Sequence, residues 1–178
     1  IRELVENHAT LSLVANALLK ARAALGLEFR AIEKRLLTIA RADKRVRRLM
    51  TTPGVGALVA LTFSAAIDDP DRFRSSRMVG AHFGLTPRKY QSGETDVTGR
   101  ISKIGDHEVR VVLYEAANVM LTRPVKGSTL KRWALAVAKR AGMRKAKVAL
   151  ARKLAVVLHH MMRSGTAFSQ TGQPAAAV

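Results

Sequence analysis

Seven large apolar residues recur at every seventh position across the first fifty residues of the chain. They are Leu4, Leu11, Leu18, Leu25, Ile32, Ile39 and Val46. A stripe of this period keeps one face of an α-helix apolar, and over this many repeats it is typical of a helix that packs in a coiled coil. The pattern predicts a helical arm over residues 1–50, used for dimerisation or for packing against a partner domain. The alternative is an ordinary amphipathic helix on a globular core.

The second apolar seam of this arm is irregular. Val14 and Ala21 lie three residues after the stripe, whereas Phe29 and Leu36 lie four residues after it. Gly26 falls near the change, so a bend or a tight helical hairpin at that position is an open alternative to a straight helix.

Charge points to a polyanionic partner. The 178 residues include 31 Lys and Arg against 13 Asp and Glu, a formal net charge of +18. No acidic residue follows Glu115, whereas twelve Lys and Arg do. Nucleic acid is the first expectation, ahead of an acidic membrane, because the basic segments carry few aromatic anchors.

Composition also bounds the class of protein. Cysteine is absent, which excludes disulfides and thiolate metal sites. The longest apolar run, Ala57 to Ile67, is too short to span a bilayer. We expect a cytoplasmic, nucleoid-associated protein of bacterial or archaeal type, with no membrane partner.

The segment Pro53-Gly-Val-Gly56 is typical of a helix–hairpin–helix. Thr52 is pushed out of the helical region by the proline that follows it, and Gly54 and Gly56 permit a tight turn before a helix that runs to Ile67. Free N–H groups at the start of that helix suit a phosphate, so we predict both glycines as contacts to a DNA backbone. A purely structural turn fits these residues equally well.

The remaining pattern is mainly helical. Three carboxylates between residues 68 and 71 predict a turn and a helix cap rather than a metal site. A short helix is expected over 76–83, and Asp106 is a suitable N-cap for the next helix. Two basic helices are expected over 130–141 and 145–162, before a frayed tail from 164 to 178.

One serine stands out between these helices. Ser92 lies between Gln91 and Gly93 in a polar, Gly-rich segment over 85–105, which we expect to form a short β-hairpin or an ordered loop. A hydroxyl among cations suits attack on a phosphodiester, because the cations hold the phosphate and stabilise the added charge. The expected phosphate-binding cations are Arg88, Lys89, Arg100, Lys103 and Arg110. Arg110 lies in the first turn of the following helix, off its apolar face, and is free to point toward this loop. The alternative is a basic surface loop with an ordinary serine.

The order of the motifs resembles the C-terminal half of the insertion sequence 110 family of transposases. The resemblance covers about residues 45–163. The matching motifs are PGVG at 53–56, DRF at 71–73, GLTP at 84–87, QSG at 91–93, RISKIGDHEVR at 100–110 and ARKLA at 151–155.

This resemblance implies a mobile-element recombinase that cuts and rejoins DNA. The family's N-terminal half is a RuvC-like domain with a DEDD set of acidic metal ligands, joined through a coiled coil to the transposase domain. Its QSG serine, here Ser92, forms a covalent link to a DNA 5′ phosphate, and some members use a structured bridge RNA as a guide. The implied domains are a coiled-coil arm over 1–50, a transposase domain over 51–163 and a flexible tail over 164–178.

The RuvC-like half is not in this sequence. We therefore expect no metal site or cofactor in this chain, with magnesium in the missing domain, and little or no activity from the chain alone. Binding of DNA and self-association through the arm are still expected. His82 and His107 flank the serine loop, but neither is assigned as the general base. Two alternatives are a non-catalytic helix–hairpin–helix nucleic-acid-binding module and a helical RNA-binding scaffold of the ribosomal kind.

Overall fold

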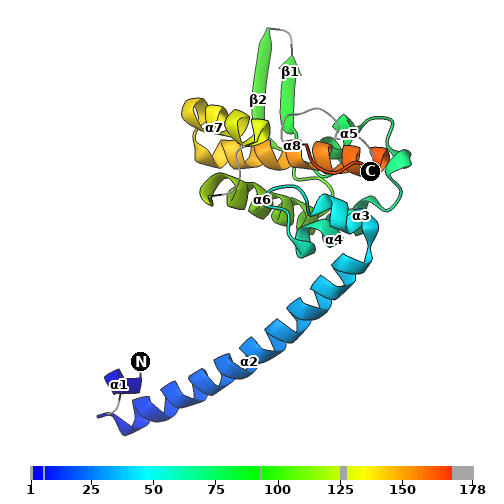
Figure 1. The fold of residues 1–178 in the computed structure, drawn as a ribbon. Helices are drawn as coiled ribbons and strands as arrows, with labels where there is room; N and C mark the ends of the chain where they lie inside the picture. The colour runs from blue at the N-terminus through cyan, green and yellow to red at the C-terminus, as the bar shows by residue number, and fades with distance from the viewer. Residues whose placement is uncertain (1, 6, 93, 125–127, 170–178) are drawn as a thin grey trace. The chain divides into compact units, whose positions relative to one another are not determined.

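The computed structural model describes residues 2–5, 7–92, 94–124 and 128–169, and it is mainly helical, as predicted (Figure 1). Its contacts divide the chain into two units, Ile1–Ile39 and Ala40–Val178. The elements in chain order are α1 (Arg2–Val5), α2 (Ala9–Ala42), α3 (Lys44–Leu49), α4 (Ala57–Ile67), the 3-10 turn η1 (Pro70–Arg72), α5 (Ser76–His82), β1 (Pro87–Ser92), β2 (Thr95–Ile101), α6 (His107–Thr122), α7 (Thr129–Ala141) and α8 (Met143–Ser164).

The first unit consists mostly of α2, and its apolar stripe is exposed. Leu18 is 66% exposed and Leu25 is 71% exposed. The helix runs unbroken through Gly26, so the alternative of a helical hairpin at that glycine is wrong. Nothing within the described chain covers the stripe between Leu11 and Ile39, which leaves an apolar helix face open to a partner.

By length and mean hydropathy alone, α2 could also cross a bilayer. Its apolar half contains Lys20 and Arg22. Inserting each such charge at the centre of a membrane helix costs about 2.5–3.5 kcal/mol of free energy. Beside the seam of a coiled coil the same side chain stays in water and pays no such cost. Length and composition therefore do not favour the membrane over a protein partner.

The predicted arm is interrupted at Asp43. This residue has an extended backbone (φ −88°, ψ 117°), and its carboxylate accepts hydrogen bonds from the N–H groups of Arg45 and Val46. The cap ends α2 and begins α3. Val46, the last residue of the stripe, is consequently 1% exposed and belongs to the core of the second unit.

The core of the second unit is built around α8. This helix packs against α5, α6 and α7, and α4 packs against α6. Leu150, Leu154 and Leu158 follow the helical period and are fully buried, as expected for the apolar face of a central helix. Phe63 and Phe83 pack in the same core with ring centroids 5.9 Å apart.

Local signals account for most helix boundaries. Asp106 caps α6 by accepting from the N–H of Val109, and Asp69 caps the η1 turn, so the acidic cluster forms a turn and a cap as predicted. Helix α8 starts at Met143 rather than at the predicted residue 145. Only Gly142, with φ +85°, separates it from α7.

Residues 165–169 follow α8 back onto the core. Phe168 donates its backbone N–H to Oγ1 of Thr51 at 2.9 Å, and its side chain packs against the buried core. The rest of the predicted tail, residues 170–178, lies outside the described residues.

Candidate catalytic hairpin and nucleic-acid interface

Strands β1 and β2 form the predicted hairpin, which stands clear of the helices of its unit (Figure 1). Every residue of β1 is exposed. Ser92 ends this strand and pairs with Thr95 across the turn. The Ser92 side chain is exposed, and its hydroxyl has no hydrogen-bond partner in the described part of the chain. An exposed, unpaired hydroxyl at a hairpin tip is accessible to a large substrate.

The pairing register decides which side chains share a face of the hairpin. Tyr90 pairs with Val97, and Lys89 pairs with Thr98. Because side chains alternate along a strand, Ser92 lies on the face of Tyr90 and Val97, whereas Lys89 lies on the other face. Tyr90 and Val97 are 58% and 53% exposed, so the serine face carries an exposed apolar pair.

A bulge near the base of the hairpin places two arginines across from each other. Strand β2 has one extra residue there, so Gly99 and Arg100 both lie opposite Arg88. Arg88 also donates from Nη2 to the carbonyl oxygen of Ser102 at 3.1 Å. Both arginines remain exposed, and together they give the base of the hairpin a double positive charge.

These arginines do not reach the serine. A strand rises about 3.3 Å per residue, and Arg88 lies four residues before Ser92. Arg88, and Arg100 opposite it, are therefore about 13 Å from Ser92 along the strand. The charged residues nearest the tip are acidic: Glu94 lies in the turn, and Asp96 is the second residue of β2, where it pairs with Gln91. The strands therefore do not assemble the expected ring of cations around the hydroxyl.

The base of the hairpin is held by close backbone packing. Gly84 has φ +65°, and a Cβ there would collide with the backbone of Ile104. A Cβ on Gly105 would likewise collide with the carbonyl of His82. Lys103, with φ +58°, donates its N–H to the carbonyl of Gly84 at 3.0 Å. The segments 84–87 and 102–106 thus cross in close backbone contact, which we call the crossing. Only glycine fits at its two contact points, Gly84 and Gly105.

Arg110 clamps the same crossing. Its Nη1 lies 3.3 Å from the carbonyl oxygens of both Phe83 and Ile104, 2.8 Å from that of Gly105 and 3.1 Å from that of Asp106. The guanidinium thus points to the base of the serine loop, with Nη1 turned onto its backbone. Because Arg110 belongs to α6 and donates to these carbonyl oxygens, it fixes the base of the hairpin relative to α6.

The two glycines of the α3–α4 turn have different surroundings. Gly54 has φ +83°, and a Cβ there would lie 2.5 Å from the carbonyl oxygen of Ala116 in α6, so this glycine serves close packing. Gly56 is exposed at the start of α4, with no side-chain cap. Figure 1 shows the hairpin rising on one side of α8, whereas α3 and α4, which this turn joins, lie on the other side with α6. The predicted contacts therefore belong to two separate surfaces.

Most of the positive charge has no acidic counterpart. Within the described ranges, Arg163 is the only lysine or arginine in a salt bridge, with Nε 3.2 Å from the Asp71 carboxylate. The same residues contain no group of three His, Asp or Glu side chains that could hold a metal ion. The described surface is suited to a polyanion.

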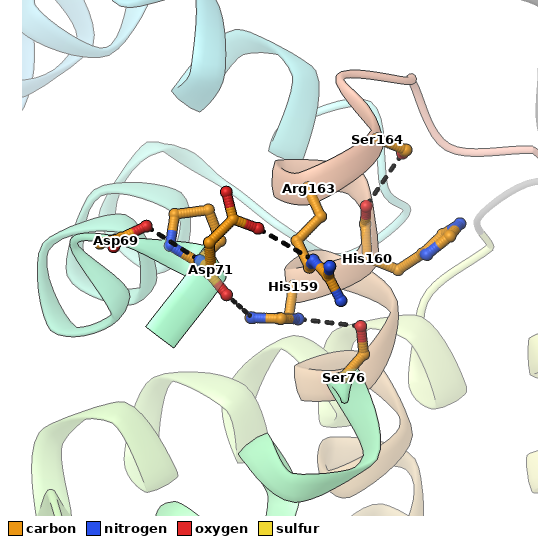
Figure 2. A network of polar contacts seen from close by, with 8 residues as sticks. Asp69, Asp71, Ser76, His159, His160, Arg163 and Ser164 are labelled. Atoms are coloured by element: carbon orange, nitrogen blue, oxygen red, sulfur yellow. Dashed lines mark hydrogen bonds and ion pairs between the residues drawn. The ribbon is translucent and has the colours of Figure 1, made fainter. Parts of the chain in front are cut away.

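A polar network that the sequence does not reveal connects α8 to α5 and η1 (Figure 2). His159 is fully buried, with Nε2 2.9 Å from the carbonyl oxygen of Pro70 and Nδ1 2.9 Å from Oγ of Ser76. A carbonyl only accepts, so Nε2 carries the hydrogen and Nδ1 accepts from the serine. Burial lowers the pKa of His159, which keeps the ring neutral. In the sequence this histidine is notable only as a neighbour of the exposed His160.

Comparison with known protein sequences identifies the family of this chain. Residues 46–134 match the family described as Transposase IS116/IS110/IS902 family. The chain is 39% identical over 128 residues to the transposase for insertion sequence element IS1111A of Coxiella burnetii, an alignment that covers 71% of this chain and 35% of that protein. It is 33% identical over 140 residues to the transposase for IS1328 of Yersinia enterocolitica, with 78% and 42% covered.

A third relative is a probable family 20 transposase of Pseudomonas aeruginosa, 30% identical over 138 residues, with 77% of this chain and 41% of that protein covered. The chain thus spans well under half the length of each of these three relatives. The family match covers half of the chain and includes the α3–α4 turn, the hairpin and α6. This chain therefore belongs to the IS116/IS110/IS902 family of transposases.

Proposed function

We propose that this chain is the C-terminal part of a DNA transposase and that Ser92 is its nucleophile. The observation that carries the proposal is an exposed hydroxyl without a partner among the described residues, displayed at the tip of a hairpin whose base is fixed. Membership of a transposase family supports DNA as the substrate. An ordinary surface serine does not need a clamped hairpin to present it.

The proposed step exchanges one phosphodiester for another. Oγ of Ser92 bonds to the scissile phosphorus, and the bond from that phosphorus to the 3′ oxygen breaks. The serine proton passes to a base, and the departing 3′ oxygen takes up a proton. A 3′ hydroxyl from another DNA end later attacks the serine-linked 5′ phosphate and releases Ser92. Because each bond broken is replaced by one of the same kind, rejoining needs no external energy source.

The described residues supply positioning more than activation. Arg88, Lys89, Arg100 and Lys103 are exposed on or just beyond the strands, where they would hold phosphates that flank the scissile one. Arg110 would contribute mainly through the backbone it holds. The described residues form no metal site, so we place magnesium in the RuvC-like domain that the resemblance implies and assign no step on this chain to it.

The test is Ser92→Ala in the full-length protein, with a cleavage assay on a denaturing gel. We expect DNA binding to persist while both strand cleavage and the covalent protein–DNA adduct disappear. Thr98→Ala is the matched control, because it removes another exposed hydroxyl from the same hairpin. An adduct that still forms with Ser92→Ala would falsify the assignment of the nucleophile.

A second candidate function is non-catalytic binding of nucleic acid. It is favoured by the many cations without an acidic partner and by the exposed start of α4 at Gly56. Binding would then be dominated by phosphate contacts and would weaken steeply with salt, with little sequence preference. Absence of any covalent adduct with the full-length protein, together with retained salt-sensitive binding, would favour this candidate over the transposase.

Two partners complete the proposal. The exposed stripe of α2 supports self-association of the chain through a coiled coil, because a second copy would cover the same apolar face. A structured bridge RNA is a further expected partner by resemblance. Footprinting of RNA co-purified with the full-length protein would test it.

A further inference from the structure

A pocket of about 630 Å³ lies between α7, α8 and residues 165–169. Its apolar floor includes Trp133, Met161 and Phe168, and its rim includes the exposed side chains of Lys153 and His160. Sites for small organic ligands have volumes of roughly 300–1,000 Å³ and combine apolar walls with a few polar groups. This pocket has both properties, and it is distant in the sequence from the serine hairpin.

We propose that this pocket binds an unpaired base of single-stranded DNA, which stacks on Trp133. The inference rests on the proposed function, because strands that are exchanged between DNA ends leave their complements and expose unpaired bases. It adds a binding site for such a strand on α7 and α8, outside the hairpin.

The contact between Trp133 and Lys153 supports an aromatic ligand. Trp133 is only partly buried, and Nζ of Lys153 lies over its ring, 4.0 Å from the centroid. A cation over an exposed ring contributes less than a stacked base does. When a base takes the ring face, the flexible Lys153 side chain is free to turn to the phosphate of the same nucleotide.

Charge selects a nucleotide over other occupants of an apolar pocket. No acidic side chain lines the pocket, and no acidic residue follows Glu115 in the sequence. Lys153 and His160 therefore face a ligand without competing carboxylates. A second copy's α2 would bring mostly apolar and basic side chains to these rim groups, with Glu28 and Glu33 as its only carboxylates, so most placements would bury the rim groups unpaired at a cost in free energy.

Shape selects an unpaired base over a duplex. The pocket is lined by residues of α7, of α8 and of the segment 166–169. A single flat ring can enter between such walls, whereas the bases of a duplex are stacked inside the helix and must be turned out first.

Trp133 is the only tryptophan in the chain, so its fluorescence reports directly on the pocket. The experiment titrates the 178-residue chain with a ten-nucleotide thymidine strand, with the matching duplex and with a ten-nucleotide uridine strand. We expect saturable quenching by the single DNA strand and little quenching by the duplex. Quenching by the RNA strand alone would overturn the assignment to DNA, and a protein-concentration dependence without DNA would identify a second copy as the occupant.

Matched variants distinguish binding in the pocket from nonspecific attraction of DNA to the positive charge of the chain. Lys153→Gln is expected to weaken single-strand binding severalfold, whereas Lys139→Gln, which removes an exposed charge from α7 outside the pocket lining, is expected to change it less. Trp133→Leu should lower the affinity for the strand by about tenfold, measured by anisotropy of a labelled strand, with Trp133→Phe restoring most of it. Since Trp133 also packs on the core, thermal melting is recorded for every variant.

The outcome does not depend on the chemistry of the hairpin. Ser92→Ala should leave the quenching unchanged, so loss of cleavage and loss of base stacking are measured independently. If Lys153→Gln and Lys139→Gln lose affinity for the single strand equally and the parent chain shows no quenching, the pocket proposal is wrong. The proposal that Ser92 is the nucleophile would be unaffected.

Discussion

Oγ of Ser76 donates a hydrogen bond to Nδ1 of His159 across 2.9 Å, and this bond connects the first residue of α5 to the buried face of α8 (Figure 2). The other ring nitrogen donates to the carbonyl of Pro70, so both nitrogens are used only when the ring is neutral. Burial, the largest cause, lowers the pKa of His159 from 6.5, and Arg163 lowers it further. The Pro70 carbonyl and Asp71 act in the opposite direction.

The network predicts a pH-dependent stability with a defined sign. The unfolded chain binds a proton at His159 more readily than the folded chain does. The contribution of His159 to the free energy of unfolding is therefore fully present above pH 6.5, and it is lost as the pH falls through the lowered pKa of the folded state. The midpoint of thermal unfolding should therefore decrease between pH 7.5 and pH 5. His159→Gln should flatten this dependence, and the exposed neighbour change His160→Gln should not. A similar slope in parent and His159→Gln would contradict the role of the buried ring.

Gly54 is expected to be intolerant of any side chain. Gly54→Ala places a Cβ 2.5 Å from the Ala116 carbonyl oxygen at φ +83°, which combines backbone strain of about 1–2 kcal/mol with overpacking of about 1–3 kcal/mol. Urea unfolding should show a loss of roughly 2–5 kcal/mol. Gly56→Ala is the control, because a Cβ there meets nothing within 4 Å. Its cost should stay below about 1 kcal/mol.

Arg110 should stabilise the base of the hairpin. Arg110→Ala removes a charged donor from the carbonyls of Phe83, Ile104 and Gly105, at a cost of about 1–3 kcal/mol given its partial exposure. Amide hydrogen exchange over residues 87–101 should accelerate more than exchange in α8. Arg100→Ala, which changes an exposed strand residue, should leave both measurements nearly unchanged. Equal exchange in the two variants would show that Arg110 does not hold the hairpin.

The local parts of the fold follow from the sequence because their causes are local. Asp106 precedes an apolar period and caps α6 as predicted, and α4 spans the apolar run from Ala57 to Ile67. The break at Asp43 also had a local signal, an N-cap residue directly before a short basic helix, which the longer heptad pattern masked. The hairpin was one of two structures expected for residues 85–105, and it is the one that forms.

The parts that sequence reasoning missed depend on distant partners. Arg110 turns inward because Phe83, which lies 27 positions earlier, presents a carbonyl to it. His159 meets Ser76 from 83 positions away, and neither periodicity nor motif spacing encodes such a pairing. The separation of Gly56 from Ser92 likewise follows from packing of α4 on α6, which no local pattern specifies.

The stripe of α2 should mediate self-association. Leu18→Glu introduces a charge at a residue that is 66% exposed in the single chain, so it should not affect folding of the second unit. Sedimentation should show a parent oligomer that Leu18→Glu disrupts. Ala23→Glu adds the same charge away from the stripe and is expected to leave the oligomer intact. Flotation of the parent chain with lipid vesicles, and a monomer in their absence, would show that the face serves a membrane instead.

The acidic residues at the hairpin tip should oppose DNA binding. Glu94 and Asp96 are exposed at the hairpin tip, on either side of Thr95, which pairs with Ser92, and their charges repel an approaching phosphate. Glu94→Gln is expected to tighten binding of a DNA duplex by about two- to threefold at low salt, with the gain lost near 0.5 M salt as screening increases. Glu108→Gln is the control, because it removes an exposed acid from the start of α6 rather than from the tip. Binding that weakens in Glu94→Gln would mean that this carboxylate accepts a proton or a hydrogen bond from the complex, and cleavage rates of the full-length protein across pH would then distinguish those two roles.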